Sequence, residues 1–264
     1  MFRLGDFAFD RIQMGVAENF NDELLYALMQ LADATIDITA GETKEIRDKD
    51  GNLVRKIYQA KEGTFSANNA MMNTNILSAA GGSPIERATQ DKIMAMPSIE
   101  IVKAGSTITL TDAVEGSVKV MGAYKNGASG DAYTLGTTAS ATEFAYNAET
   151  GVVTPPTVTG DDAPAEYLVV YEKNQKDGFK IANIADKFPA TIKLTLKALY
   201  VDPCLKDHVR PAYIVLPSFQ PSPEVSVATA TDTQLEYKGD LQIDYCGEDK
   251  ALYYIYFPNE TTTV

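Results

Sequence analysis

Two long stretches in the last third of the chain alternate strictly between apolar and polar residues. Leu235–Tyr245 does so over eleven residues, and Thr191–Ala198 repeats the pattern. A period of two is typical of a β-strand with one buried face, and most strands run only about five or six residues. Such a chain must bury one side of a long sheet and keep the other side in water. The sequence therefore predicts a mainly β protein.

The polar side of these strands has two interpretations, and the pattern leaves both open. It is either a solvated outer surface or the lining of an aqueous channel in a barrel that closes between subunits, an arrangement that removes exposed strand edges. The second stretch places Lys193 and Lys197 on the same kind of face. The candidate lumen or solvent face consists of Asp37, Glu236, Asp240, Gln242 and Asp244.

A second unit runs from Ala34 to Gly82. Ala34–Thr39 alternates like a strand, and the stretch Asp48–Asn52 is rich in residues that tolerate turn geometry, so a hairpin is expected there. Val54–Tyr58 supplies the returning strand. Ser66 is a candidate cap for a helix whose apolar stripe reaches Ala80, and Gly81-Gly82 supplies a left-handed stop.

Charges of both signs alternate along the hairpin Glu42–Lys56. This pattern is compatible with a simple solvated surface and equally with contact to a complementary surface on a neighbouring copy. The residues that would make such a contact are Glu42, Glu45, Arg47, Asp48, Asp50, Arg55 and Lys56.

The remaining elements complete a three-part organisation. Asn21–Ala32 is predicted to form an amphipathic helix, and Ser83–Met96 a second short helix or an ordered loop. Residues 97–165 are rich in Gly, Ala, Ser and Thr, with short strands at the spacing of a sandwich or meander and turns at Asn126-Gly127, Ser129-Gly130 and Gly160-Asp161. We expect an N-terminal core half (1–96), an inserted β-rich module (97–165) and a C-terminal core half (166–264).

Side chains that could perform chemistry are few. The single histidine, His208, lies four residues after Cys204, and Cys246 is the only other cysteine. A zinc site needs three or four protein ligands, and no phosphate-binding or nucleophile motif is present. We therefore expect no enzyme, no cofactor and no metal site.

The net charge of −13 limits the partners that a 264-residue chain can have. Proteins that bind nucleic acid by neutralising phosphates present basic surfaces, and anionic membranes attract basic segments. Charges at positions 3, 6, 10 and 11 argue against a secretory signal, and no run of eighteen apolar residues exists. Neither specific DNA binding nor a membrane location is expected.

The order of motifs from Glu42 onward resembles that of the tail tube proteins of long-tailed bacteriophages. The shared features are a self-contained hairpin with Asp50-Gly51-Asn52 at its tip, the stretch Thr64–Ala70, and an apolar helix that ends in small residues. Glu166–Pro258 also resembles the family. The resemblance implies an antiparallel β-sandwich or open barrel with one or two flanking short helices, to which residues 97–165 add a β-rich insertion.

The resemblance also implies a function. Six copies would close a ring, rings would stack into a tube that is assembled in the host cytoplasm and joins other tail proteins, and DNA would leave through it without specific binding. The hairpin would reach the adjacent ring. Two alternatives stay open: a carbohydrate-binding or adhesin module, which the composition of 97–165 favours, and another capsid or baseplate component.

Overall fold

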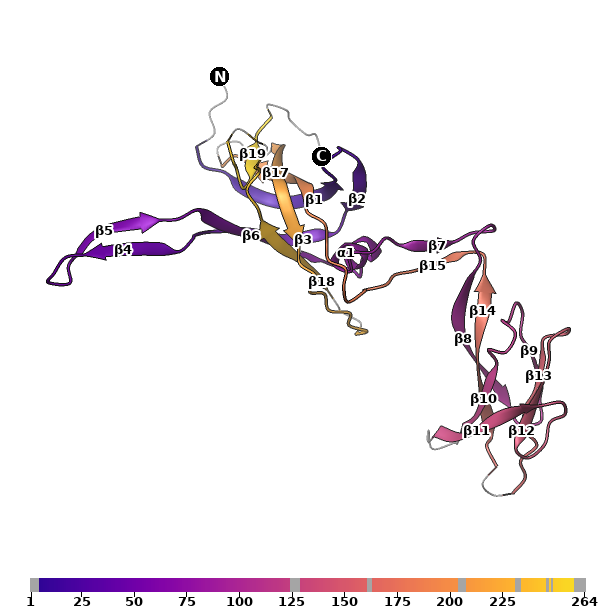
Figure 1. The fold of residues 1–264 in the computed structure, drawn as a ribbon. Coiled ribbons are helices and arrows are strands. Elements are labelled where there is room, and N and C mark those ends of the chain that lie inside the picture. Colours follow the sequence, from indigo (N-terminus) through magenta and orange to yellow (C-terminus); the bar gives the residue numbers. More distant parts are fainter. Residues whose placement is uncertain are drawn as a thin grey trace. The chain divides into compact units, whose positions relative to one another are not determined.

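The computed structural model describes residues 5–123, 129–160, 163–203, 208–230, 234–245, 247 and 249–258. Antiparallel strands dominate, and one short helix is present in this described part (Figure 1). The predicted fold class is confirmed. Two compact units form, one from the described parts of Met1–Ile85 and Ile181–Val264, the other from those of Glu86–Lys180. The second unit extends beyond the expected 97–165 module at both ends.

The first unit is built on an eight-stranded sheet in the order β2-β1-β16-β17-β18-β6-β3, with β19 paired to β17. All of its pairings are antiparallel, and the sheet curves into a nearly closed, barrel-like form. Its strands are β1 (Ala8–Glu18), β2 (Leu24–Leu28), β3 (Leu31–Ala40), β6 (Lys61–Asn69), β16 (Ile192–Val201), β17 (Val209–Pro221), β18 (Leu235–Leu241) and β19 (Tyr254–Tyr256).

The concave face of this sheet holds the core. The apolar positions that alternate along β16, from Ile192 to Ala198, are buried as predicted. Phe65 on β6 meets Phe219 on β17 edge to face, with ring centroids 5.6 Å apart. These long strands are therefore held by one shared apolar face.

The helix predicted over Asn21–Ala32 is wrong, because this segment forms β2 and the start of β3. The side-chain oxygen of Asn19 accepts hydrogen bonds from the backbone N–H groups of Asn21 and Glu23, each at 2.9 Å, and turns the chain. Strand β2 then pairs with β1, where Val16 lies opposite Ala27. Pairing to the sheet outweighs the local helical pattern.

The helix predicted to follow Ser66 exists but begins later than expected. Ser66 lies inside β6, between β3 and β18, and cannot act as a cap there. The helix α1 spans Thr74–Ala80, and the Asn73 side chain caps it by accepting from the backbone N–H groups of Asn75 and Ile76. Gly82 adopts the predicted left-handed conformation, with a φ of 59°.

Two other expectations are also corrected. Ser83–Met96 is neither a helix nor a loop throughout, because β7 (Glu86–Ala88) pairs with β15 (Gly178–Lys180) and β8 begins at Met94. The long strand from Leu235 ends at Leu241, short of Tyr245, which is 82% exposed. There the Asp244 carboxylate accepts the backbone N–H of Gly247 and starts a turn.

The second unit is a seven-stranded sheet in the order β8-β14-β10-β11-β12-β13-β9, parallel only between β11 and β12. Tyr167, Val169 and Phe144 lie in its own core. The prediction of a turn at Ser129-Gly130 is wrong, because both residues belong to β11. The turns predicted at Asn126-Gly127 and Gly160-Asp161 involve residues outside the described part, namely Asn126, Gly127 and Asp161. Its strands are β8 (Met94–Lys103), β9 (Ile108–Thr109), β10 (Lys119–Ala123), β11 (Ser129–Gly136), β12 (Glu143–Asn147), β13 (Val152–Thr154) and β14 (Glu166–Gln175).

Gly239 in β18 lies where the surrounding atoms leave no room for a side chain. A Cβ atom there would lie 2.1 Å from the backbone oxygen of Gln220 and 2.7 Å from the Phe219 ring. We expect Gly239→Ala to lower the free energy of unfolding by about 1–3 kcal/mol, the usual cost of overpacking. Urea denaturation measures the change. The control is Gly5→Ala, where no atom lies within 4 Å of the new Cβ, and an equal loss in both variants would contradict the prediction.

A tyrosine pair inside the first unit predicts loss of stability at high pH. The hydroxyls of Tyr26 and Tyr237 lie 2.9 Å apart, and burial raises the pKa of Tyr26 from 10.0 to about 12 and that of Tyr237 in the same direction. Because the folded state holds these protons more tightly than the unfolded state, their contribution is complete below pH 10 and falls as the pH rises toward 12.

We expect the wild-type protein to lose on the order of 2 kcal/mol more stability over this pH range than a Tyr26→Phe/Tyr237→Phe variant. Chemical denaturation at a series of pH values measures the difference. Tyr245→Phe, at an exposed position, is the control and should follow the wild type. Parallel curves for the wild type and the double variant would contradict the interpretation.

Candidate functional site

The charged segment between β3 and β6 forms the predicted hairpin. Strand β4 (Thr43–Arg47) pairs with β5 (Leu53–Tyr58), and the two strands form a sheet of their own. Figure 1 shows them as a two-stranded ribbon separate from the eight-stranded sheet. At the root of the hairpin, the backbone N–H of Gly41 donates to the carbonyl of Ala60.

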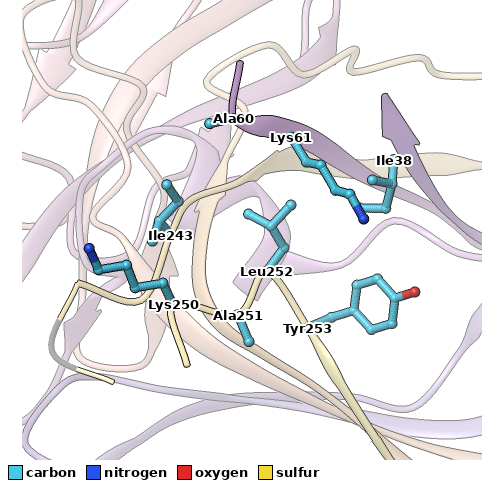
Figure 2. A pocket seen from close by; sticks show the side chains of 8 residues that line it. All are labelled: Ile38, Ala60, Lys61, Ile243, Lys250, Ala251, Leu252 and Tyr253. Atoms are coloured by element: carbon cyan, nitrogen blue, oxygen red, sulfur yellow. The ribbon is translucent and has the colours of Figure 1, made fainter. Parts of the chain in front are cut away.

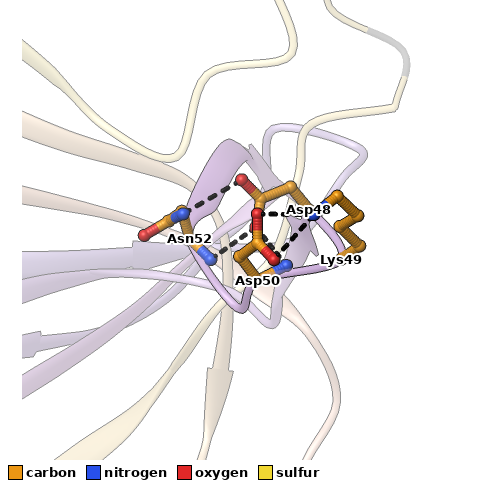
Figure 3. Close-up of polar contacts among 4 residues, drawn as sticks. All are labelled: Asp48, Lys49, Asp50 and Asn52. Carbon is orange, nitrogen blue, oxygen red and sulfur yellow. Dashed lines mark hydrogen bonds and ion pairs between the residues drawn. The ribbon is translucent and has the colours of Figure 1, made fainter.

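A single carboxylate organises the tip of the hairpin (Figure 3). The Asp48 side chain accepts the backbone N–H groups of Asp50 at 2.9 Å and Asn52 at 2.8 Å, and the Asn52 side-chain amide at 3.1 Å. These bonds, with the Asn52 side chain contributing most, hold the pKa of Asp48 below its usual value. Gly51 has a φ of 84°, which only glycine adopts readily. The turn predicted at Asp48–Asn52 is therefore confirmed.

The hairpin exposes apolar side chains along its whole length. Leu53, Val54 and Tyr58 are 51%, 65% and 63% exposed, and Ile46 and Ile57 are also exposed. An isolated two-stranded hairpin is only marginally stable in water. A hairpin with this composition is expected to gain stability by packing against another surface.

All seven residues proposed for the hairpin contact lie on or next to this ribbon, and all are exposed. Two ion pairs are internal to the hairpin: Arg47 to Glu45 at 2.6 Å and Lys49 to Asp50 at 2.9 Å. Contact with a neighbouring copy stays a prediction. The apolar residues between the charges also indicate a contact surface, and the sequence analysis did not consider them.

Strand register brings three of the five residues of the candidate lumen or solvent face together. Asp240 on β18 lies opposite Thr64 on β6, and Thr64 lies opposite Asp37 on β3. Glu236 lies four residues before Asp240 on the same strand and therefore on the same face. Gln242 and Asp244 follow the end of β18, so they do not continue this row.

Two lysines of the outer face, Lys238 and Lys193, are paired with acids. Lys238 lies 3.2 Å from Glu236 and 3.5 Å from Glu224, and the hydrogen bond to Glu236 is the main cause of its raised pKa. Lys193 lies 2.8 Å from Glu18, which raises the pKa of that lysine too. The sequence interpretation noted the lysine but not its partner, because the two residues are brought together only by the pairing of β1 with β16.

A pocket of about 570 Å³ opens beside the root of the hairpin (Figure 2). Ile38 on β3 and Leu252 line it, together with Lys250 and Lys61 at the start of β6, whose ammonium group lies beside Ile38. Three segments far apart in the sequence form this pocket, so no sequence pattern predicted it. Its remaining lining residues are Ala60, Ile243, Ala251 and Tyr253.

The residues considered for chemistry do not form a site in the part of the chain that the structure describes. His208 is exposed, whereas Cys204 and Cys246 lie outside the described residues. Among the described residues, no group of three or more His, Cys, Asp or Glu side chains is placed to bind a metal ion. Within the same residues, no helix has the length and hydrophobicity of a membrane span.

Of the comparisons with known proteins, one finds a family. No curated protein matches the chain. The model of the YomU/Tube protein family matches residues 12–246, which include the hairpin, the helix, the seven-stranded sheet and, apart from β19 and the start of β1, the eight-stranded sheet. Because the match covers most of the sequence, the chain belongs to the YomU/Tube family and is a structural protein of the bacteriophage tail tube.

Proposed function

We propose that copies of this protein close into six-membered rings, that the rings stack into the tail tube, and that DNA leaves the virion through it. The observation that carries the proposal is the hairpin β4–β5, whose strands are exposed along their whole length and carry large apolar side chains. Such a surface requires a partner, and in a self-assembling tube the partner is another copy. The number six follows from the resemblance to the tail tube family.

Ring closure has a physical basis in the ends of the eight-stranded sheet. Strands β2 and β3 terminate the strand order, so each offers one unpaired edge within the described part of the chain. Leu24 and Leu25 on β2 are exposed as well. Long unpaired edges invite pairing with another strand, and joining subunits edge to edge satisfies their backbone groups.

The passage of DNA is consistent with the charge of the protein. DNA carries one negative charge per roughly 1.7 Å of its axis, so a basic channel would retain it. The chain has a net charge of −13, and Asp37, Glu236 and Asp240 share one polar face of the sheet. If this face lines the channel, DNA slides along it without specific binding.

The second unit is suited to contacts with other tail proteins. Ile99 and Ile101 on β8 lie opposite Val170 and Leu168 on β14, and Leu168 lies opposite Met121 on β10. Both isoleucines, Val170 and Met121 are exposed. A contiguous exposed apolar group of this kind marks an interaction surface.

Assembly would take place in the host cytoplasm, as expected for this family.

Removing the hairpin tests the proposal. Replacing Thr43–Tyr58 by a short Gly-Ser linker should leave rings intact and abolish tubes, because only the contact between rings is lost. Electron microscopy and analytical ultracentrifugation measure both. An Ile46→Thr/Ile57→Thr variant keeps the hairpin strands and should shorten the tubes. Normal tubes without the hairpin, or a wild-type protein that stays monomeric at every concentration and salt, would contradict the proposal.

Charge reversal tests the lining of the channel. We expect tubes of an Asp37→Lys/Glu236→Lys/Asp240→Lys variant to retain double-stranded DNA that wild-type tubes do not, with retention that weakens as salt increases. Co-sedimentation of labelled DNA measures the binding. The control reverses three exposed acids of the second unit, Glu100, Glu115 and Glu149, and so changes the net charge equally. Equal retention by both variants would place the three acids outside the channel.

A further inference from the structure

We propose that the pocket beside the hairpin root receives the hairpin tip of a copy in the adjacent ring. This inference rests on the proposed stacking function and identifies its docking site. The pocket and the tip belong to the same compact unit, but each lies at a different end of the hairpin. A tip-to-root contact therefore joins two different surfaces of the same protein.

The pocket combines positive charge with an apolar wall. Figure 2 shows the ammonium group of Lys61 beside Ile38, whereas the side chain of Lys250 extends away from Leu252 on the side of Ile243. Within the described residues, neither lysine forms an ion pair with a carboxylate, and Lys250 lies 5.4 Å from the ring centre of Tyr245. An occupant that carries a carboxylate next to an aliphatic side chain would complement both features.

The hairpin tip has this composition. Asp48 and Asp50 flank Lys49, and the Arg47 guanidinium donates to the carbonyl of Gly51 at 3.0 Å, so the charges of the tip balance and Asp50 supplies the carboxylate. Leu53 and Val54 follow directly and are both more than half exposed. The carboxylate of Asp50 lies at the surface, where Lys49 is its only partner among the described residues, and it is free to approach a second ammonium group (Figure 3).

The hairpin strands carry charges that suit the surface leading to the pocket. Beyond the tip, the strands carry more basic than acidic residues; Lys44 lies near the root, and Arg55, opposite Ile46, lies nearer the tip. On the body of the first unit, Asp33 and Asp37 of β3 precede the pocket-lining Ile38. The Asp50 carboxylate at the tip would meet the ammonium group of Lys61 at the pocket, and the basic hairpin strands would lie along the surface that carries Asp33 and Asp37.

A contact of this kind explains open-ended growth. The tip and the pocket are different surfaces, so the interface is heterologous and leaves one free tip and one free pocket at the ends of any stack. The pocket volume of about 570 Å³ is large enough for several side chains. Each ring would add to the next by the same contact, repeated around the tube axis.

Two charge reversals test the docking site. Asp50→Lys places a cation at the tip, and Lys250→Glu places an anion in the pocket; neither residue contributes a side chain to the turn or to the core. Each variant alone should raise the protein concentration needed for tube formation by about tenfold or more, because like charges meet at every contact between rings. Electron microscopy and sedimentation measure this concentration.

Mixing the two variants should restore tubes, since rings can then alternate with opposite charges at each contact, and the double variant should also assemble. Glu115→Lys and Lys103→Glu, on the second unit, are matched controls that should assemble as the wild type does. If hairpin removal abolishes tubes but the mixture fails to assemble, the pocket is not the docking site and stacking by the hairpin stands. If either single variant assembles normally, the inference is overturned.

Discussion

The structure depends on the burial of one face of a long, curved antiparallel sheet. Apolar residues at every second position of β16 and β18 point into the same core, where Phe65, Phe219 and Tyr237 meet edge to face. Because the side-chain period of a strand is two, the polar residues between them all reach the opposite face. One constraint therefore produces both the stability of the subunit and the polar surface that Asp37, Glu236 and Asp240 share.

The same sheet also explains why the surfaces proposed for assembly lie at its ends. It curves without closing completely, so β2 and β3 keep unpaired edges among the described residues, and β3 continues directly into a hairpin whose strands are exposed. Such elements are poorly stabilised in a single subunit. In the proposed assembly, they would gain their packing partners from neighbouring copies, so that folding within the subunit and assembly between subunits would use the same kind of apolar burial.

Local propensity and tertiary pairing disagree at several places, and pairing prevails each time. Asn21–Ala32 has a helical stripe, yet Leu28 and Leu31 are buried when the segment joins β1 and β6 as strands. Ser66 could cap a helix, but it lies in β6 and is paired with strands on both sides. Strand pairing satisfies backbone groups and buries side chains together, whereas a helix of about twelve residues is marginal without packing of its own.

The sequence by itself determined the mainly β class, the buried alternation of β16, the hairpin turn at Asp48, the left-handed Gly82 and the family resemblance. These depend on local chemistry: side-chain period, turn-forming residues and positive φ. Only the tertiary structure decided that Glu18 pairs with Lys193, that Asp37 aligns with Asp240, and that Lys61 and Lys250 share a pocket. Each of these requires segments far apart in the sequence to be in register, and register is fixed by the packing of the whole core.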